Sequence, residues 1–145
     1  MTDHFSTSPD ETRAIARVFA KQLKEGSIIL LSGTLGAGKT LFVQGLCEAL
    51  ALYEIWEVDS PTYTIMKEYQ TTPLSIHFDL YRIQSESELE ALSFYELMES
   101  DAIKFIEWPE RLVQYKVPRD GFLVRINKTG LQQREIAITE FHAEI

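Results

Sequence analysis

The stretch "GTLGAGKT", residues 33–40, constrains the fold of this chain more than any other feature. It directly follows "SIILLS", in which Ile28 to Leu31 form an uninterrupted apolar run. The segment after it, "KTLFVQGLCEALA", has apolar residues at helical spacing. A buried strand, a glycine-rich turn and a helix in this order predict an α/β fold with parallel strands.

The same stretch fits the pattern G-x-x-x-x-G-K-[ST] at every fixed position. Glycines let the backbone curl so that successive N–H groups face phosphate oxygens, and the following helix contributes the partial positive charge of its N-terminus. In this pattern the lysine reaches the β- and γ-phosphates and the threonine hydroxyl coordinates Mg²⁺. We therefore predict a nucleoside triphosphate site made of Gly33, Thr34, Leu35, Gly36, Ala37, Gly38, Lys39, Thr40 and Leu41.

The choice of nucleotide can be predicted from a second, incomplete motif. Proteins that bind GTP read guanine with an Asn-Lys-x-Asp element. The segment "NKTG" begins in the same way, but Gly130 stands where the aspartate is needed. We therefore expect ATP as the nucleotide and an ordinary hairpin turn at this segment.

A P-loop site also needs a carboxylate at a strand end to hold Mg²⁺ or its water. Asp79 lies in the strand-like run "IHFDLYR", and Glu107 ends the strand-like run "AIKFIE". Each carboxylate interrupts an otherwise apolar or aromatic stretch, which favours a functional role over that of a solvated surface group. Both are candidates for the site.

The remaining segments complete a mixed α/β pattern. A helix is expected over residues 8–26, with Ser8 as its N-cap, Pro9 at its first position and Gly26 as its C-cap. The runs "SPTYTIMKEYQ" and "LSIHFDLYRI" predict a hairpin or two neighbouring strands, "SESELEALSFYELMES" a helix, and residues 121–141 a closing hairpin. The expected architecture is a single domain, residues 1–145, of the P-loop NTPase type: a three-layer α/β sandwich with a mostly parallel central sheet and antiparallel additions.

Composition limits the classes of partner. The net charge of −8 argues against a broad nucleic-acid-binding surface, which normally needs a basic face. Cys47 is the only cysteine, and no run approaches the length of a membrane span. We expect a cytoplasmic protein with no membrane contact.

Four motifs in a fixed order resemble the bacterial TsaE (YjeE) family. They are the glycine-rich stretch, "SPTYT", "HFDLYR" and "IEWPER", and the resemblance runs from about Asp10 to Trp108. Members of this family are small P-loop ATPases needed for threonylcarbamoyl modification of the adenosine next to the anticodon of certain tRNAs. The resemblance implies Mg-dependent ATP hydrolysis that regulates or resets a complex of the TsaD and TsaB proteins, with tRNA contacted only indirectly.

Family roles carry over to matching positions of this chain. Thr40 and Glu107 resemble the Mg²⁺ ligands, and Asp79 resembles the acidic residue close to the metal, which acts through water or orients the attacking water. With Lys39, these two carboxylates form the implied catalytic set. The nucleotide-binding positions outside the glycine-rich stretch are Asp10, Glu11, Thr62 and Trp108.

Two other functions remain open at this point. A P-loop small-molecule kinase would use an arginine-bearing lid, yet no arginine cluster lies between the expected helices. A binding module would change partner affinity on ATP binding without hydrolysis. Arg82 is a candidate arginine finger or a surface residue, and His77 is most simply a hydrogen-bonded structural histidine.

Overall fold

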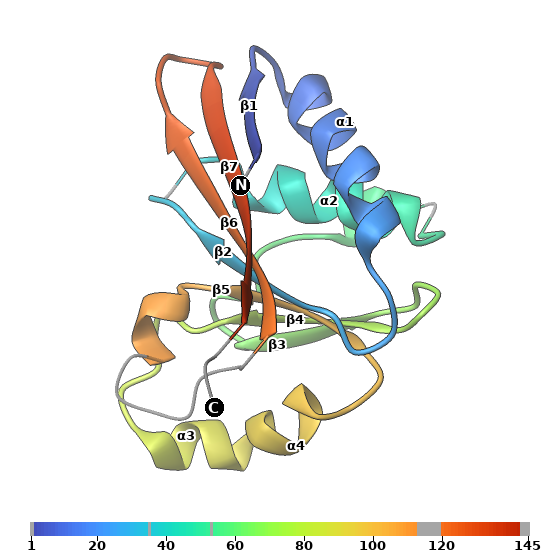
Figure 1. Cartoon of the computed structure of the whole chain (residues 1–145). Coiled ribbons are helices and arrows are strands. Elements are labelled where there is room, and N and C mark those ends of the chain that lie inside the picture. Colours follow the sequence, from blue (N-terminus) through green and yellow to red (C-terminus); the bar gives the residue numbers. More distant parts are fainter. Residues whose placement is uncertain (1, 35, 53, 113–119, 143–145) are drawn as a thin grey trace.

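A computed structural model describes residues 2–34, 36–52, 54–112 and 120–142 of the chain. Within these ranges seven strands form one mixed sheet in the order β1-β7-β6-β2-β5-β4-β3 (Figure 1). The strands are β1 (Thr2–Ser6), β2 (Ile28–Ser32), β3 (Met66–Tyr69), β4 (Ser75–Asp79), β5 (Ile103–Glu107), β6 (Asp120–Lys128) and β7 (Arg134–His142).

The centre of the sheet is parallel and its margins are antiparallel. Strand β2 pairs in parallel with β5 and β6, and β4 pairs in parallel with β5. The antiparallel pairs are β3 with β4, β6 with β7 and β1 with β7. The predicted α/β class, both hairpins and the parallel centre are therefore confirmed.

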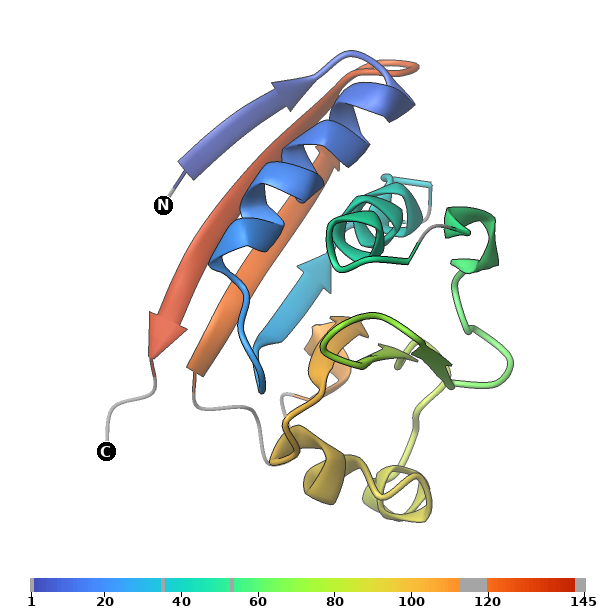
Figure 2. The ribbon, with the colours of Figure 1, turned by 90° about the vertical axis from the view of Figure 1, so that its right-hand side faces the viewer.

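Helices cover both faces of this sheet (Figure 2). Helices α1 (Pro9–Phe19) and α2 (Lys39–Ala49) lie on one face, and the short helices α3 (Glu86–Ala91) and α4 (Phe94–Met98) lie on the other. Single 3-10 turns occur at Ala20–Gln22, Ile55–Glu57 and Pro109–Leu112.

Strand β2 shows how the two faces are kept apart. Ile29 and Leu31 belong to the apolar core under α1 and α2, whereas Ile28 and Leu30 belong to the core under α3 and α4. Alternate side chains of a strand point to opposite faces, so one apolar strand supplies both layers. This arrangement is the predicted three-layer sandwich.

Helix α1 begins as predicted and ends early. The Ser8 side chain accepts the Glu11 backbone N–H at 3.1 Å, which is the expected N-cap. The helix ends at Phe19 and not at Gly26, which adopts φ +83° in the turn before β2. The α1–α2 contact is close: a Cβ on Gly45 of α2 would lie 2.4 Å from the Arg13 carbonyl oxygen, so this position requires glycine.

The acidic segment expected to be one helix is two. Ser93 adopts φ 57° between α3 and α4, which breaks the helical hydrogen bonding. The break lets both Leu89 and Phe94 point into the core under the sheet. None of the helices described is both long and apolar enough to cross a membrane.

The polar N-terminus, for which no element was predicted, forms strand β1. It pairs along β7, with His4 opposite Ile136. Most of its side chains are exposed, so the strand lacks the apolar pattern that marks a half-buried strand in a sequence.

Candidate functional site

Three adjacent strands end in register at one edge of the sheet. Glu107, the last residue of β5, pairs with Leu31 of β2 on one side and with Asp79, the last residue of β4, on the other. Because parallel strands present their carboxyl ends at the same edge, the two carboxylates lie beside the loop that follows β2. This edge is the candidate site.

The glycine-rich loop connects β2 to α2 in a conformation that glycine permits. Gly36 and Gly38 have φ +76° and +112°, and a Cβ on Gly33 would lie 2.7 Å from the Ile126 carbonyl oxygen. Gly38 is the N-cap of α2, so the first N–H groups of this helix have no intrahelical acceptor. Such a loop and helix start form a binding site for an anion.

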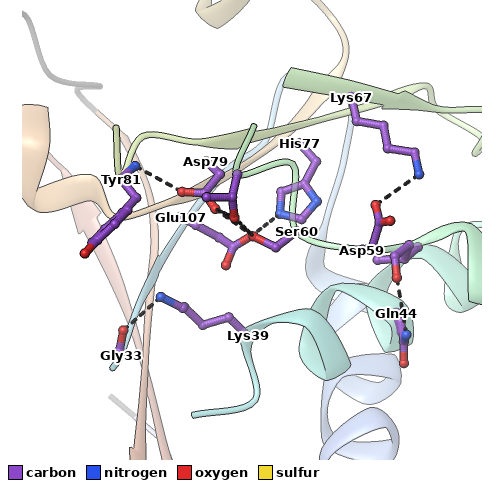
Figure 3. A network of polar contacts seen from close by, with 12 residues as sticks. Gly33, Lys39, Gln44, Asp59, Ser60, Lys67, His77, Asp79, Tyr81 and Glu107 are labelled. Atoms are coloured by element: carbon purple, nitrogen blue, oxygen red, sulfur yellow. Dashed lines mark hydrogen bonds and ion pairs between the residues drawn. The ribbon is translucent and has the colours of Figure 1, made fainter. Parts of the chain in front are cut away.

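Lys39 brings a positive charge into this site. Its side chain is almost buried, and Nζ donates to the Gly33 carbonyl at 2.8 Å (Figure 3). Nζ also lies 4.1 Å above the ring centre of Trp108. Burial lowers the pKa of the Lys39 ammonium, while the charges of Glu107 and Asp79 act in the opposite direction. The lysine thus faces two carboxylates across the site.

Ser60 lies between the two carboxylates. Its Oγ is 2.7 Å from Asp79 Oδ2 and 3.1 Å from Glu107 Oε2. The Thr62 hydroxyl donates to the same Asp79 oxygen at 2.9 Å, and the Tyr81 N–H donates to Oδ1 at 3.0 Å. A serine has one proton and cannot donate to both carboxylates at once. The pair therefore concentrates more negative charge than its hydrogen-bond donors compensate.

A buried chain of side chains fixes Glu107 from behind. His77 Nε2 lies 2.6 Å from Glu107 Oε2 (Figure 3). His77 Nδ1 lies 2.9 Å from the Tyr69 hydroxyl. Burial raises the pKa of Tyr69, so its hydroxyl keeps its proton. The Tyr69 hydroxyl has one proton and two acceptors within reach, the Asp59 carbonyl at 3.2 Å and His77 Nδ1; whichever of them accepts it, the contact from His77 Nε2 engages Glu107 Oε2. Since Oε2 is thereby engaged, Oε1 is the Glu107 oxygen available to a ligand.

These groups surround a cleft of about 460 Å³. It is lined by Gly36, Gly38, Lys39, Thr40, Leu41, Ser60, Thr62, Asp79, Tyr81, Glu107 and Trp108. In the described part of the chain, no group of three or more His, Cys, Asp or Glu side chains is placed to enclose a metal. A cation here would therefore take ligands from the Thr40 hydroxyl, the carboxylates and the oxygens of a bound phosphate or water, a set that suits Mg²⁺.

Most of the predicted site residues meet in this cleft, and a few do not. Of the loop residues that do not line the cleft, Gly33 contributes the carbonyl that binds Lys39, and the Ala37 side chain is buried. Thr34 is exposed, and Leu35 lies outside the described residues. Asp10 and Glu11 do not line the cleft: Asp10 pairs with Arg13 at 3.0 Å, and the Glu11 carboxylate bonds Thr7. Their part in nucleotide binding stays a prediction.

Arg82, the candidate arginine finger, lies outside the cleft. Its guanidinium carbon is 4.3 Å from the ring centre of Tyr63, and both side chains are exposed. This is a cation–π contact on the surface. Among the described residues that line the cleft there is no arginine.

Two residues that touch the site carried no functional assignment from the sequence. Tyr69 lies in none of the predicted site motifs, yet its hydroxyl contacts His77. Arg134 lies beyond the region with motifs, yet Nε donates to the Ala37 carbonyl at 2.6 Å and Nη2 to the Gly36 carbonyl at 3.2 Å. Both contacts are tertiary, and no spacing pattern in the sequence marks them.

Known proteins match this chain over most of its sequence. The family model described as "Threonylcarbamoyl adenosine biosynthesis protein TsaE" matches residues 6–136. The TsaE protein of Bacillus subtilis is 38% identical over 135 residues, covering 92% of this chain and 82% of that protein. The TsaE protein of Rickettsia conorii is 34% identical over 136 residues, covering 91% and 73% of the two chains.

The fold comparison gives the same result. The crystal structure of YdiB from Bacillus subtilis superposes with a TM-score of 0.74 and 30% sequence identity, covering 97% of this chain and 85% of that chain. Since the family model matches most of the sequence and the relatives align over nearly all of it, the chain belongs to the TsaE family of threonylcarbamoyl adenosine biosynthesis proteins.

Proposed function

We propose that this protein binds Mg-ATP in the cleft and hydrolyses it as a component of the machinery that makes threonylcarbamoyladenosine in tRNA. One observation carries the proposal: Lys39 and the glycine-rich loop face Asp79 and Glu107, which end adjacent strands in register. This arrangement supports phosphate binding at one wall of the cleft and cation binding at the opposite wall.

The proposal gives the main polar groups of the cleft a role in binding or hydrolysing ATP. The N–H groups of the loop and of the first turn of α2 bind the phosphates, and Lys39 moves from the Gly33 carbonyl to the terminal phosphates. The Thr40 hydroxyl and Glu107 Oε1 would hold Mg²⁺, and Asp79 would orient the attacking water. The ion, when bound, neutralises the charge that develops on the phosphate oxygens. The uncompensated charge around Ser60 supports a cation at this place.

The absence of an arginine from the described lining of the cleft supports slow turnover by the protein alone. P-loop switches that lack a fully placed catalytic arginine turn over at about 10⁻⁴ to 10⁻² per second, and a partner raises that rate by roughly 10³ to 10⁵. By family, the partners are the TsaD and TsaB proteins, whose complex the ATPase cycle would regulate or reset. With a net charge of −8, tRNA would be reached through these partners.

The test uses a fluorophore within the cleft. Trp108 contacts Lys39, whereas Trp56 is 74% exposed and does not line the cleft. In a Trp56→Phe background, Mg-ATP should change the emission of Trp108, and GTP should require at least several-fold higher concentration. The complementary Trp108→Phe protein, which keeps Trp56, is the control and should show little change.

The rate of phosphate release is measured next, alone and with TsaD and TsaB. The proposal predicts slow basal turnover that changes when the pair is added. Turnover of tens per second that the pair does not alter would refute partner control, and phosphate transfer to an added metabolite would favour the kinase. ATP binding with no hydrolysis under any condition would leave a nucleotide-dependent binding module.

A further inference from the structure

The side chain of Arg134 joins the two loops beside the cleft. Its Nε and Nη2 bond the Ala37 and Gly36 carbonyls of the glycine-rich loop, at 2.6 and 3.2 Å. Its Nη1 lies 2.9 to 3.4 Å from three carbonyls of the β6–β7 connection, those of Gly130, Leu131 and Gln133. All five acceptors are backbone carbonyls. Among the described residues no carboxylate pairs with this guanidinium, so its charge is not neutralised by a neighbouring anion.

The glycine-rich loop needs an external restraint. Gly36 and Gly38 both adopt positive φ, and glycine loses more conformational freedom on ordering than any other residue. Ala37 N–H bonds Thr34 O within the loop at 3.1 Å. Arg134 adds contacts from outside the loop. Its Nε also lies beside Gly38, because a Cβ placed on that glycine would be 3.7 Å from the Arg134 Nε.

Peptide geometry connects these contacts to the ligand. In a planar trans peptide the carbonyl of one residue and the N–H of the next point in opposite directions. When Arg134 holds the Ala37 carbonyl, the Gly38 N–H points away from the guanidinium. Gly38 lines the cleft, and no described residue accepts a hydrogen bond from its N–H. Arg134 thus turns a loop donor toward the space that an anion would occupy.

We propose that Arg134 is a positioning residue for the phosphate tail of the nucleotide. It fixes the peptide planes of the glycine-rich loop so that the Gly38 N–H faces the cleft, and it adds a second cation beside the loop. This inference rests on the proposed function, because it concerns the polyphosphate group of the same ligand.

Only a planar guanidinium can donate to all of these carbonyls at the same time. A guanidinium presents five N–H donors in fixed directions, whereas an ammonium is a point charge with three donors on a flexible stem. Lysine at position 134 would keep the charge but would not bridge Gly36, Ala37 and the β6–β7 connection together. The two variants Arg134→Lys and Arg134→Gln therefore separate the geometry from the charge.

Binding of ATP and of inorganic tripolyphosphate is measured by calorimetry in EDTA, at a temperature where melting curves show every variant folded. We expect Arg134→Gln and Arg134→Lys each to weaken both ligands by roughly 10- to 100-fold, as when charge-assisted hydrogen bonds are lost. The preference for ATP over GTP should not change, because the base is not involved. Arg125→Gln and Arg125→Lys are matched controls, because Arg125 is exposed on β6. Both control variants should bind ATP and tripolyphosphate as the wild type does.

The other possible outcomes overturn either the positioning role of Arg134 or the proposed function. If Arg134→Lys binds like the wild type while Arg134→Gln does not, only charge matters and the positioning role is overturned. Affinities within twofold of the wild type for both variants, or an equal loss in Arg125→Gln, also overturn it. A wild-type protein that binds neither ATP nor tripolyphosphate would instead refute the proposed function itself.

Discussion

Among the residues that the structure describes, two lysines are buried, one at each end of the parallel strands, and they have different surroundings. Lys39 lies at the carboxyl ends of the strands, where it faces Glu107 and Asp79 across an open cleft. Lys104 lies near the start of β5, fully buried, and its Nζ donates to the Ser100 carbonyl at 2.7 Å. Burial lowers the pKa of both ammonium groups, that of Lys104 to about 8.

The comparison shows that burial of a charge does not by itself make a site. Lys104 bonds a carbonyl of its own chain just after α4, and it lines no cleft described here. Lys39 bonds the Gly33 carbonyl, but anionic groups and space for a ligand lie in front of it. On this difference we propose a binding role for Lys39 and a structural role for Lys104, and substitutions can test both.

The largest effect is expected for Lys39→Met. The phosphates lose their main positive charge, so turnover of ATP should fall by at least about 10²-fold, as when a transition-state charge donor is removed. The melting temperature of the protein without nucleotide should stay near that of the wild type, because the methionine also removes the cost of a buried charge. An unfolded Lys39→Met protein would contradict the assignment and show that the residue is structural.

The next effect concerns Glu107 and separates metal binding from nucleotide binding. Glu107→Gln keeps the size of the side chain and removes its charge, so affinity for Mg-ATP should fall about 10-fold or more. In EDTA the affinity for ATP should be unchanged or higher, since one repulsive charge near the phosphates is gone. Titrations of Trp108 fluorescence with and without Mg²⁺ measure both. An equal loss of ATP affinity with and without Mg²⁺ would show that Glu107 is not a metal ligand.

A smaller effect is expected behind the site, at His77. His77→Phe keeps a ring of similar size but removes the donor to Glu107, so the Mg²⁺ concentration for half-maximal turnover should rise by roughly 10-fold. Tyr69→Phe is the matched control, because it removes the hydroxyl and leaves the His77–Glu107 contact of 2.6 Å in place. Its Mg²⁺ dependence should stay within about threefold of the wild type. If His77→Phe has wild-type Mg²⁺ dependence, His77 only fills space.

The parts of this picture that could be predicted from the sequence are those encoded locally. The loop over residues 33–40 has its glycines, lysine and threonine at fixed spacing after an apolar strand, and the structure has strand β2 and helix α2 on either side. Asp79 and Glu107 each end an apolar strand, so strand pairing alone brings them together.

The parts that could not be predicted depend on contacts between distant segments. Strand β1 is polar and exists because β7 offers it an edge. The break at Ser93 follows from the need to bury both Leu89 and Phe94. Arg134 meets Gly36 and Ala37 across almost a hundred residues of sequence, and no local spacing reports such a contact.

The last prediction concerns Lys104, whose replacement should leave catalysis unchanged. Lys104→Met removes a buried charge far from the cleft, so turnover at pH 7.5 should stay within about twofold of the wild type. This variant is the counterpart of Lys39→Met, and a large loss of turnover would remove the distinction between the two lysines. Its measurable effect should be on stability and should depend on pH.

The direction of that effect follows from the lowered pKa of Lys104. Up to about pH 8 the ammonium is charged in both states, and its burial destabilises the folded protein. Between pH 8 and the ordinary pKa of 10.5 the unfolded chain binds more protons, so the free energy of unfolding of the wild type rises with pH. The stability of Lys104→Met relative to the wild type should therefore be greatest near pH 7 and decline by at most about 3 kcal/mol toward pH 10.5. Urea unfolding of both proteins across this range measures the difference, in which the titrations of Cys47 and Tyr69 cancel because both proteins contain them. A difference that does not vary with pH would show that Lys104 keeps its ordinary pKa, and the two lysines would then differ in their electrostatics as well as in their surroundings.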